Sequence, residues 1–91
     1  MDFSYEKNRI FAVDAKGKII AEVAFPNAGD NVVNIYHTFV DDSLRGQGIA
    51  SLLLDEAYKE IKKQNKKAVV TCSYAIKWFD QHSSCKDIIV K

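Results

Sequence analysis

The sequence predicts an α/β (α+β) fold, in which a three-stranded antiparallel meander leads into a βαβ crossover and a short C-terminal helix. Two observations support this prediction. Short β-favouring runs alternate with turn residues over the first 40 positions, and a leucine-rich helical pattern begins directly after two closely spaced glycines. The 91 residues are enough for one small domain with a thin core, and we expect that domain to span residues 1–91.

Composition excludes several classes of protein. Thirteen Lys and Arg residues balance twelve Asp and Glu residues, and this net charge of +1 argues against nucleic-acid binding. The N-terminus has no signal-like apolar run, and no segment approaches the roughly 18 apolar residues of a membrane span. We therefore expect a cytoplasmic protein with no membrane partner. Cys72 and Cys85 are then expected to be thiols, and their spacing indicates no metal site.

Three strands are expected in the first half of the chain. Residues 9–13 and 19–25 favour β structure and flank a hairpin turn that contains Gly17. Residues 26–31 form the strongest loop signal, and residues 32–40 are expected to form one long third strand. Strict alternation along that strand would place Val33, Ile35, His37 and Phe39 on one face.

The second half changes to helical spacing. Residues 48–65 are expected to form a helix, which leads through a short strand at residues 68–72 to a second helix at residues 74–81. The crossover makes the strand at 68–72 parallel to the third strand. Residues 88–90 are expected to add an edge strand. The apolar stripe of the first helix is expected to contain Ile49, Leu52, Leu53, Ala57, Tyr58 and Ile61. The lysines at its C-terminal end are interpreted as a solvated surface that complements the helix dipole.

The two glycines, Gly46 and Gly48, lie between the third strand and the first helix. A flexible turn at a helix N-terminus presents free N–H groups and the positive end of the helix dipole, and this arrangement binds phosphate. A P-loop is excluded because Ile49 and Ala50 stand where Lys and Ser or Thr are required. A Rossmann fingerprint is excluded because Ser51 stands at the position of its third glycine.

The loop instead carries the pattern Arg-x-x-Gly-x-Ala, formed by Arg45, Gly46, Gln47, Gly48, Ile49 and Ala50. This pattern resembles the acyl-CoA-binding motif of the GCN5-related N-acetyltransferase (GNAT) superfamily. The order of elements from about residue 19 to residue 83 also resembles the short stand-alone members, which lack the N-terminal helices of larger members. The resemblance implies a minimal GNAT-like fold that binds acetyl-CoA or coenzyme A, with the pyrophosphate on the backbone N–H groups of the loop. It also implies that backbone groups near Phe39 and Val40 pair with the pantetheine arm.

The resemblance further identifies positions near the thioester. Where many members carry Asn, Ala and a tyrosine that acts as general acid, this chain has Cys72, Ala75 and Phe79. Phenylalanine cannot donate a proton, and Tyr74 lies on a different helical face, so it is a weak substitute. Cys72 lies at a helix N-terminus, where the dipole favours a thiolate. It could act as general acid, accept an acyl group or form a mixed disulfide with CoA; the alternative is a buried, inert thiol.

His37 also has two interpretations. Imidazole titrates near neutral pH, which suits a general base for an amine. The alternative is a hydrogen-bonded core histidine beneath the helix. The sequence therefore predicts an acetyl-CoA-dependent N-acetyltransferase that acts on an unidentified amine, a small molecule or a protein tail, without a metal. The alternative function is a non-catalytic module that binds or senses CoA, and a second copy of the chain could close the open cleft as a homodimer.

Overall fold

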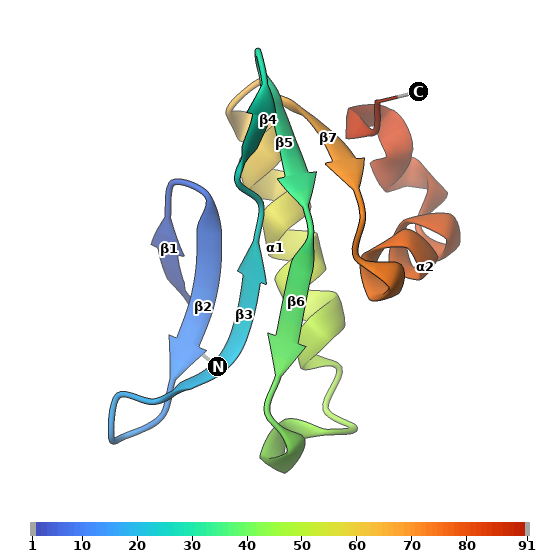
Figure 1. Cartoon of the computed structure of the whole chain (residues 1–91). Helices are drawn as coiled ribbons and strands as arrows, with labels where there is room; N and C mark the ends of the chain where they lie inside the picture. Colours follow the sequence, from blue (N-terminus) through green and yellow to red (C-terminus); the bar gives the residue numbers. More distant parts are fainter. Residues whose placement is uncertain (1, 91) are drawn as a thin grey trace.

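A computed structural model describes residues 2–90 (Figure 1). The elements follow one another as β1 (Ser4–Glu6), β2 (Arg9–Val13), β3 (Ile19–Ala24), β4 (Asn27–Gly29), β5 (Val32–Ile35), β6 (His37–Val40), the 3₁₀ turn η1 (Asp42–Leu44), α1 (Ile49–Lys63), β7 (Lys67–Val70), α2 (Ser73–Gln81) and the 3₁₀ segment η2 (Ser83–Ile88).

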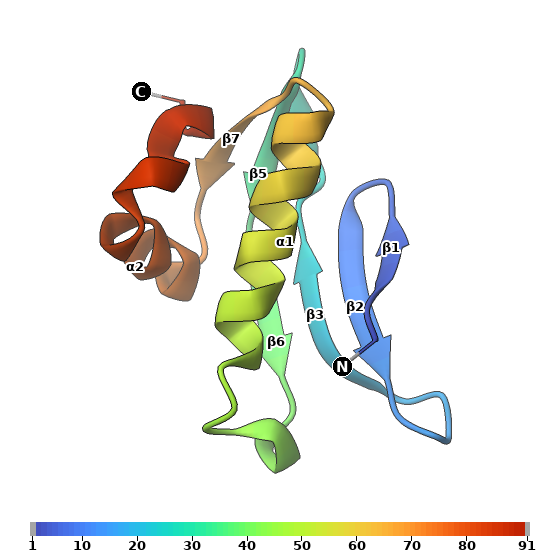
Figure 2. The same ribbon diagram turned by 180° about the vertical axis from the view of Figure 1, so that it is seen from behind.

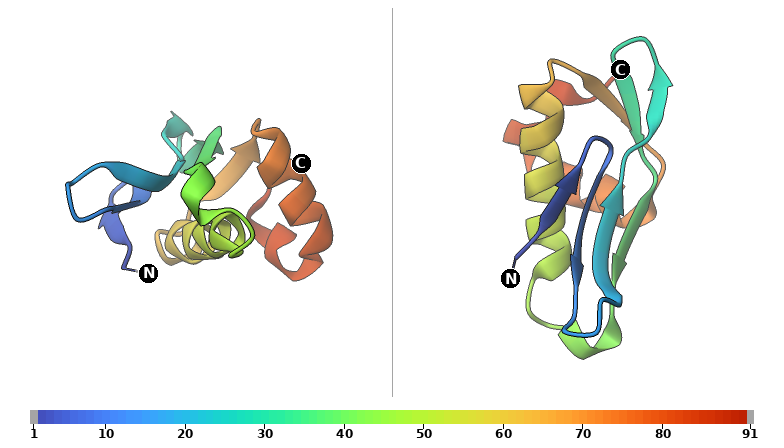
Figure 3. Two further views of the ribbon diagram at one scale, coloured as in Figure 1. Left: turned by 90° about the horizontal axis from the view of Figure 1, so that it is seen from below. Right: turned by 90° about the vertical axis from the view of Figure 1, so that its left-hand side faces the viewer.

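The strands form two sheets. One is antiparallel, in the order β1-β2-β3-β6; the other has the order β4-β5-β7, with β5 and β7 parallel. Helix α1 packs against β2, β3, β6 and β7, all on one side of the strands (Figures 2 and 3). The predicted α+β class, the antiparallel order of the first strands and the parallel crossover are confirmed. No helix within residues 2–90 covers the opposite face of the antiparallel sheet, which faces the viewer in Figure 1.

The prediction of one continuous strand over residues 32–40 is wrong. Val33 and Ile35 are fully buried, whereas Tyr36, His37 and Phe39 are exposed. The N–H of Tyr36 donates to the carbonyl oxygen of Ala24, which is also the pairing partner of His37. This one-residue irregularity reverses the alternation, as a β-bulge does, so His37 and Phe39 no longer share a face with Val33 and Ile35. It also divides the strand between two sheets, so that β6 and β7 diverge.

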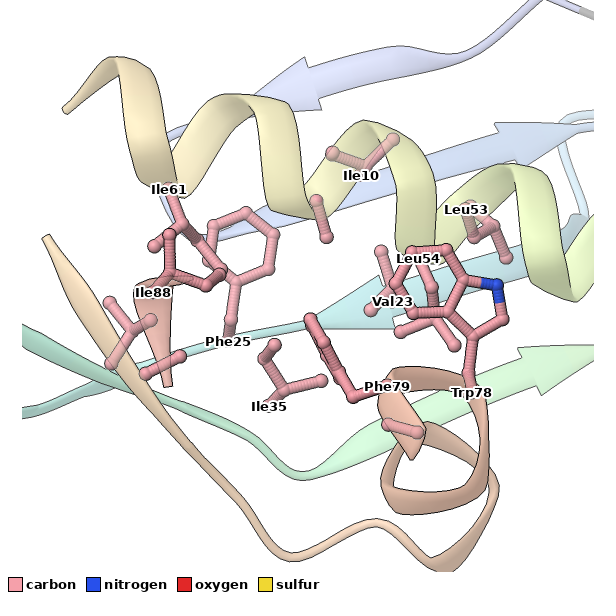
Figure 4. Close-up of a cluster of buried hydrophobic side chains, with 14 of the residues drawn as sticks. Ile10, Val23, Phe25, Ile35, Leu53, Leu54, Ile61, Trp78, Phe79 and Ile88 are labelled. Atoms are coloured by element: carbon pink, nitrogen blue, oxygen red, sulfur yellow. The ribbon is translucent and has the colours of Figure 1, made fainter. Parts of the chain in front are cut away.

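The core lies between α1 and the strands (Figure 4). The predicted helix stripe needs one correction, because Leu52 is half-exposed while Leu54 is fully buried. The inward positions predicted for α2 are confirmed: Ala75, Trp78 and Phe79 are buried.

The C-terminal strand predicted at residues 88–90 is also wrong. The 3₁₀ segment η2 extends to Ile88, and the residues after it meet β7 in one isolated parallel bridge between Ile89 and Ala68. Side chains from α1 hold this segment instead. Lys62 Nζ lies 2.8 Å from Asp87 Oδ2, and Tyr58 Oη donates to Asp87 Oδ1 at 2.9 Å. These contacts support a structural role for that part of the lysine-rich helix end.

Two strands were not predicted. Strand β4 lies within the expected loop at residues 26–31, and β1 precedes the first expected strand. The short, exposed β1 is tied to α1 by Tyr5 Oη, which donates to Glu56 Oε1 at 2.6 Å. This hydrogen bond, together with a smaller effect of burial, raises the pKa of Tyr5 to about 12. The same hydrogen bond lowers the pKa of Glu56.

We expect Tyr5→Phe to lower the free energy of unfolding at neutral pH by about 0.5–1 kcal/mol, the usual value for one partly solvated hydrogen bond. Because the pKa of Tyr5 is raised in the folded state, this contribution is fully present below pH 10 and lost as pH rises toward 12. Urea unfolding at several pH values should show the free energies of unfolding of the wild-type protein and Tyr5→Phe converging over that range.

Tyr36→Phe is the matched control, since Tyr36 is similarly exposed and its hydroxyl has no partner within residues 2–90. An equal loss in both variants would contradict the expectation.

Candidate functional site: the loop between β6 and α1

The loop after η1 turns the chain into α1 through two left-handed glycines. Gly46 has φ +79° and Gly48, the N-cap of α1, has φ +71°. A Cβ placed on either glycine would meet no atom within 4 Å. The need for glycine is therefore conformational and not steric. The helix begins at Ile49, so the first amides of α1 have no partner within the helix and remain available to a ligand.

A cavity of about 230 Å³ lies against this loop. It is lined by Val40, Leu44, Arg45, Gly46, Gly48, Ile49, Ala50 and Tyr74. The lining therefore joins the end of β6, the loop, the start of α1 and the start of α2. Of the predicted loop residues, only Gln47 is absent from the cavity lining. Leu44 and Tyr74 are additions that periodicity in the sequence did not indicate.

The acidic residues before the loop have structural partners. Asp41 accepts hydrogen bonds from the hydroxyl and the backbone N–H of Ser43, and these bonds lower the pKa of its carboxyl group. Asp42 Oδ1 lies 3.0 Å from Arg45 Nη2, but both side chains are more than three-quarters exposed. An ion pair so exposed contributes little to stability, so Arg45 can exchange this carboxylate for another anion.

Cys72 occupies the N-cap position of α2, and the Sγ atom of this half-buried residue lies 3.7 Å from Thr38 Oγ1 on β6. This contact connects β6 with the end of β7, close to the point where the two strands begin to diverge. The backbone N–H groups of Thr71 and Cys72 both donate to the carbonyl oxygen of Ile35, which fixes the end of β7. The predicted position of Cys72 at a helix N-terminus is the one observed, and its contact with β6 is an additional finding.

His37 lies on the other side of the antiparallel sheet. Because Thr38 reaches Cys72 and neighbouring residues of a strand point to opposite faces, His37 points away from Cys72. Its side chain is about half-exposed, which contradicts the interpretation as a core histidine beneath the helix. Its Nε2 lies 3.6 Å from Glu22 Oε1, and the other carboxylate oxygen of Glu22 contacts Arg9 Nε. Glu22 was not predicted to be a site residue from the sequence. Its place on the outward face of the second strand was the feature that could have identified it.

The backbone of β6 presents its free edge toward β7. The N–H of Asp41 donates to Ile20, and Phe39 pairs with Glu22, so alternation directs the polar groups of Phe39 toward β3. Those of Thr38 and Val40 point to the unpaired edge. The backbone groups available to an added strand are therefore centred on Thr38 and Val40, with Phe39 contributing its partly exposed side chain on the open face.

A larger cavity of about 560 Å³ lies between β7, α2 and η2. Most of its lining is aliphatic, and its two charged residues, Asp80 and Lys86, pair with each other at 3.0 Å. It adjoins neither the glycine loop nor a free helix N-terminus, so it offers a phosphorylated ligand no free helix amides, and its one lysine is already paired with Asp80. Within residues 2–90, no three His, Cys, Asp or Glu side chains are arranged to hold a metal ion. The helices described in that range lack the length and hydrophobicity of a membrane-spanning segment.

This fold is that of the GCN5-related N-acetyltransferase class. The family model for GCN5-related N-acetyl-transferases matches residues 9–88, and the chain belongs to this family. It is similar to Protein NATD1 of Gallus gallus, with 32% identity over 77 residues, 84% of this chain and 70% of that protein.

Solved structures agree with the family assignment. A GCN5-like protein from Staphylococcus aureus, determined by NMR, has a TM-score of 0.80 and 27% identity, covering 98% of this chain and 87% of that one. A ribosomal-protein-alanine N-acetyltransferase from Brucella melitensis biovar Abortus 2308 has a TM-score of 0.61 and 20% identity. That likeness covers 81% of this chain and 61% of the larger one, and at this identity it shows the fold alone.

Proposed function

We propose that the protein binds acetyl-CoA through residues 45–50 and transfers the acetyl group to an amine. The observation that carries the proposal is the loop: two left-handed glycines leave the first amides of α1 unpaired beside Arg45, in the lining of one cavity. Backbone amides and a guanidinium together suit a diphosphate. Family membership is consistent with this ligand.

The pantetheine arm would extend from the cavity along the free edge of β6. It would pair with the backbone groups of Thr38 and Val40 as an added strand does. Val40 lines the cavity and Thr38 contacts Cys72, so this path leads from the loop to the thiol. The thioester would then lie between Cys72 on the helix side and His37 on the open face.

Acetyl transfer to an amine forms a C–N bond, breaks the C–S bond, releases the amine proton and returns a proton to the CoA thiolate. His37 is suited to accept the amine proton from an acceptor that arrives on the open face of the sheet. Cys72 is suited either to protonate the leaving thiolate or to attack the thioester first, giving S-acetylcysteine and free CoA before the amine reacts.

One observation favours a second candidate, a CoA-binding module without turnover. Phe79, at the position of the family's tyrosine acid, is buried and has no hydroxyl group. The two candidates differ in a single measurable quantity, the release of CoA in the presence of amines.

The test is CoA release from acetyl-CoA over a panel of small amines and peptides, with intact mass measured after incubation. We expect amine-dependent release, and we expect Cys72→Ala to reduce it by about 100-fold or more, the usual effect of removing a proton-transfer group or nucleophile. Cys85→Ala is the matched control, because Cys85 is also a half-buried free thiol. Full activity of Cys72→Ala, together with no adduct on the wild-type protein, would reduce Cys72 to a packing residue. Binding without release across the panel would favour the non-catalytic module.

A further inference from the structure

Tyr74 occupies an unusual position among the tyrosines of this protein. It lies in the first turn of α2, is 45% exposed and lines the cavity at the glycine loop. Tyr5 and Tyr58 each donate their hydroxyl hydrogen to a carboxylate, whereas the Tyr74 hydroxyl has no partner within residues 2–90. A phenol with a free hydroxyl therefore forms part of the lining of the proposed cofactor site.

The position of Tyr74 is fixed by the packing of α2 on α1. Tyr74 and Trp78 are four residues apart and so share one face of α2. Trp78 Nε1 donates to Ser51 Oγ at 2.8 Å, which holds that face against the first turn of α1. The Trp78 ring also stacks on His82 at 4.0 Å, and His82 Nδ1 lies 2.7 Å from the carbonyl oxygen of Trp78. The wall that carries Tyr74 is thus held in place before any ligand binds.

The cavity offers few side-chain donors to an anion. Of the lining residues, Arg45 and Tyr74 alone have a side chain that can donate a hydrogen bond; the others are aliphatic or glycine. A diphosphate bound to the loop amides and Arg45 has further oxygens to satisfy. Tyr74 lies on α2, on the other wall of the same cavity, and carries the second of these two side-chain donors.

We propose that Tyr74 is a positioning residue for the acyl-CoA: its hydroxyl donates a hydrogen bond to the bound diphosphate, and its ring closes the cavity over the loop. This proposal rests on the function proposed above, since it requires CoA at residues 45–50. It differs from a role as the missing proton donor to the thiolate. A diphosphate contact changes affinity, whereas a proton donor changes the rate of the chemical step.

The experiment is isothermal titration of wild-type protein, Tyr74→Phe and Tyr74→Ala with acetyl-CoA. We expect Tyr74→Phe to raise Kd about tenfold, the usual cost of losing one hydrogen bond to a charged group, and Tyr74→Ala to raise it further. Ile76→Ala is the matched control: Ile76 is an equally exposed residue of α2 that lines the other cavity, and its Kd should match wild type. Melting temperatures near that of wild type would confirm that the variants are folded, as expected for a half-exposed side chain.

The outcomes separate the two proposals. If Tyr74→Phe has the same Kd as the wild-type protein, the proposed role of the hydroxyl is overturned, even if Tyr74→Ala binds acetyl-CoA more weakly. A turnover rate that falls in Tyr74→Phe at saturating acetyl-CoA, with Kd unchanged, would assign Tyr74 to proton transfer and also overturn the proposal. Failure of the wild-type protein to bind acetyl-CoA at all would overturn the proposed function itself.

Discussion

Replacing Gly48 with valine is expected to raise the Kd for acetyl-CoA by about 100-fold or more, equivalent to about 2.7 kcal/mol, while the protein stays folded. Gly48 has φ +71°, and a β-branched residue strongly resists this conformation. The exposed loop is expected to relax to another conformation, which would turn the first amides of α1 away from the ligand. Isothermal titration measures the loss.

Gly17→Val is the matched control for this variant. Gly17 has φ +83° in the turn between β2 and β3, and its Cβ would also meet no atom within 4 Å. Both variants should therefore lose similar conformational free energy, but Gly17 does not line the cavity at the glycine loop. Equal Kd values for Gly48→Val and Gly17→Val would show that the loop is not the binding site.

The second large effect concerns stability. Phe25→Ala is expected to lower the free energy of unfolding by about 3–5 kcal/mol, the usual cost of removing a buried aromatic side chain. Phe25 is fully buried, and its backbone is held by Asn8, whose carbonyl oxygen accepts the N–H of Phe25 and whose side chain donates to its C=O. The backbone therefore cannot readily collapse into the vacated space. Such a loss is a large part of the roughly 5–15 kcal/mol that stabilises a typical domain.

Urea unfolding followed by the fluorescence of Trp78 measures this effect. Trp78 is the single tryptophan of the chain and is almost completely buried, so its emission should shift to the red on unfolding. Phe39→Ala is the control, because it removes the same aromatic ring from a partly exposed position on the open face. A loss at Phe39 as large as that at Phe25 would mean that the open face is covered in solution.

The sequence located the glycine loop because its signal is local. A left-handed turn needs glycine, and the helical pattern after Gly48 is strong over its whole length. The family pattern in Arg45–Ala50 could be read without any tertiary contact. The sequence alone could not predict which of Leu52 and Leu54 is buried, because both fit an amphipathic stripe. Packing of the helix against the strands decides between them.

The break at Tyr36 could not be predicted for a related reason. Residues 32–40 have apolar side chains on both faces, so their pattern is compatible with one long strand. The two halves of this segment pair with different strands, β5 with β7 and β6 with β3. The irregularity at Tyr36 lies where the pairing changes. The same tertiary packing determines that His37 faces away from Cys72. It also places Tyr74, through the contact of Trp78 with Ser51, in the lining of the cavity.

The most direct test of the acetyl-CoA site is a titration of ¹⁵N-labelled protein with acetyl-CoA, followed by the backbone amide resonances. We predict that the largest shifts occur at Gly46, Gly48, Ile49 and Ala50, with smaller shifts along the edge of β6 at Thr38 and Val40. Shifts centred instead on the aliphatic cavity between β7, α2 and η2, or no shifts at millimolar acetyl-CoA, would contradict the assignment of the loop as the cofactor site.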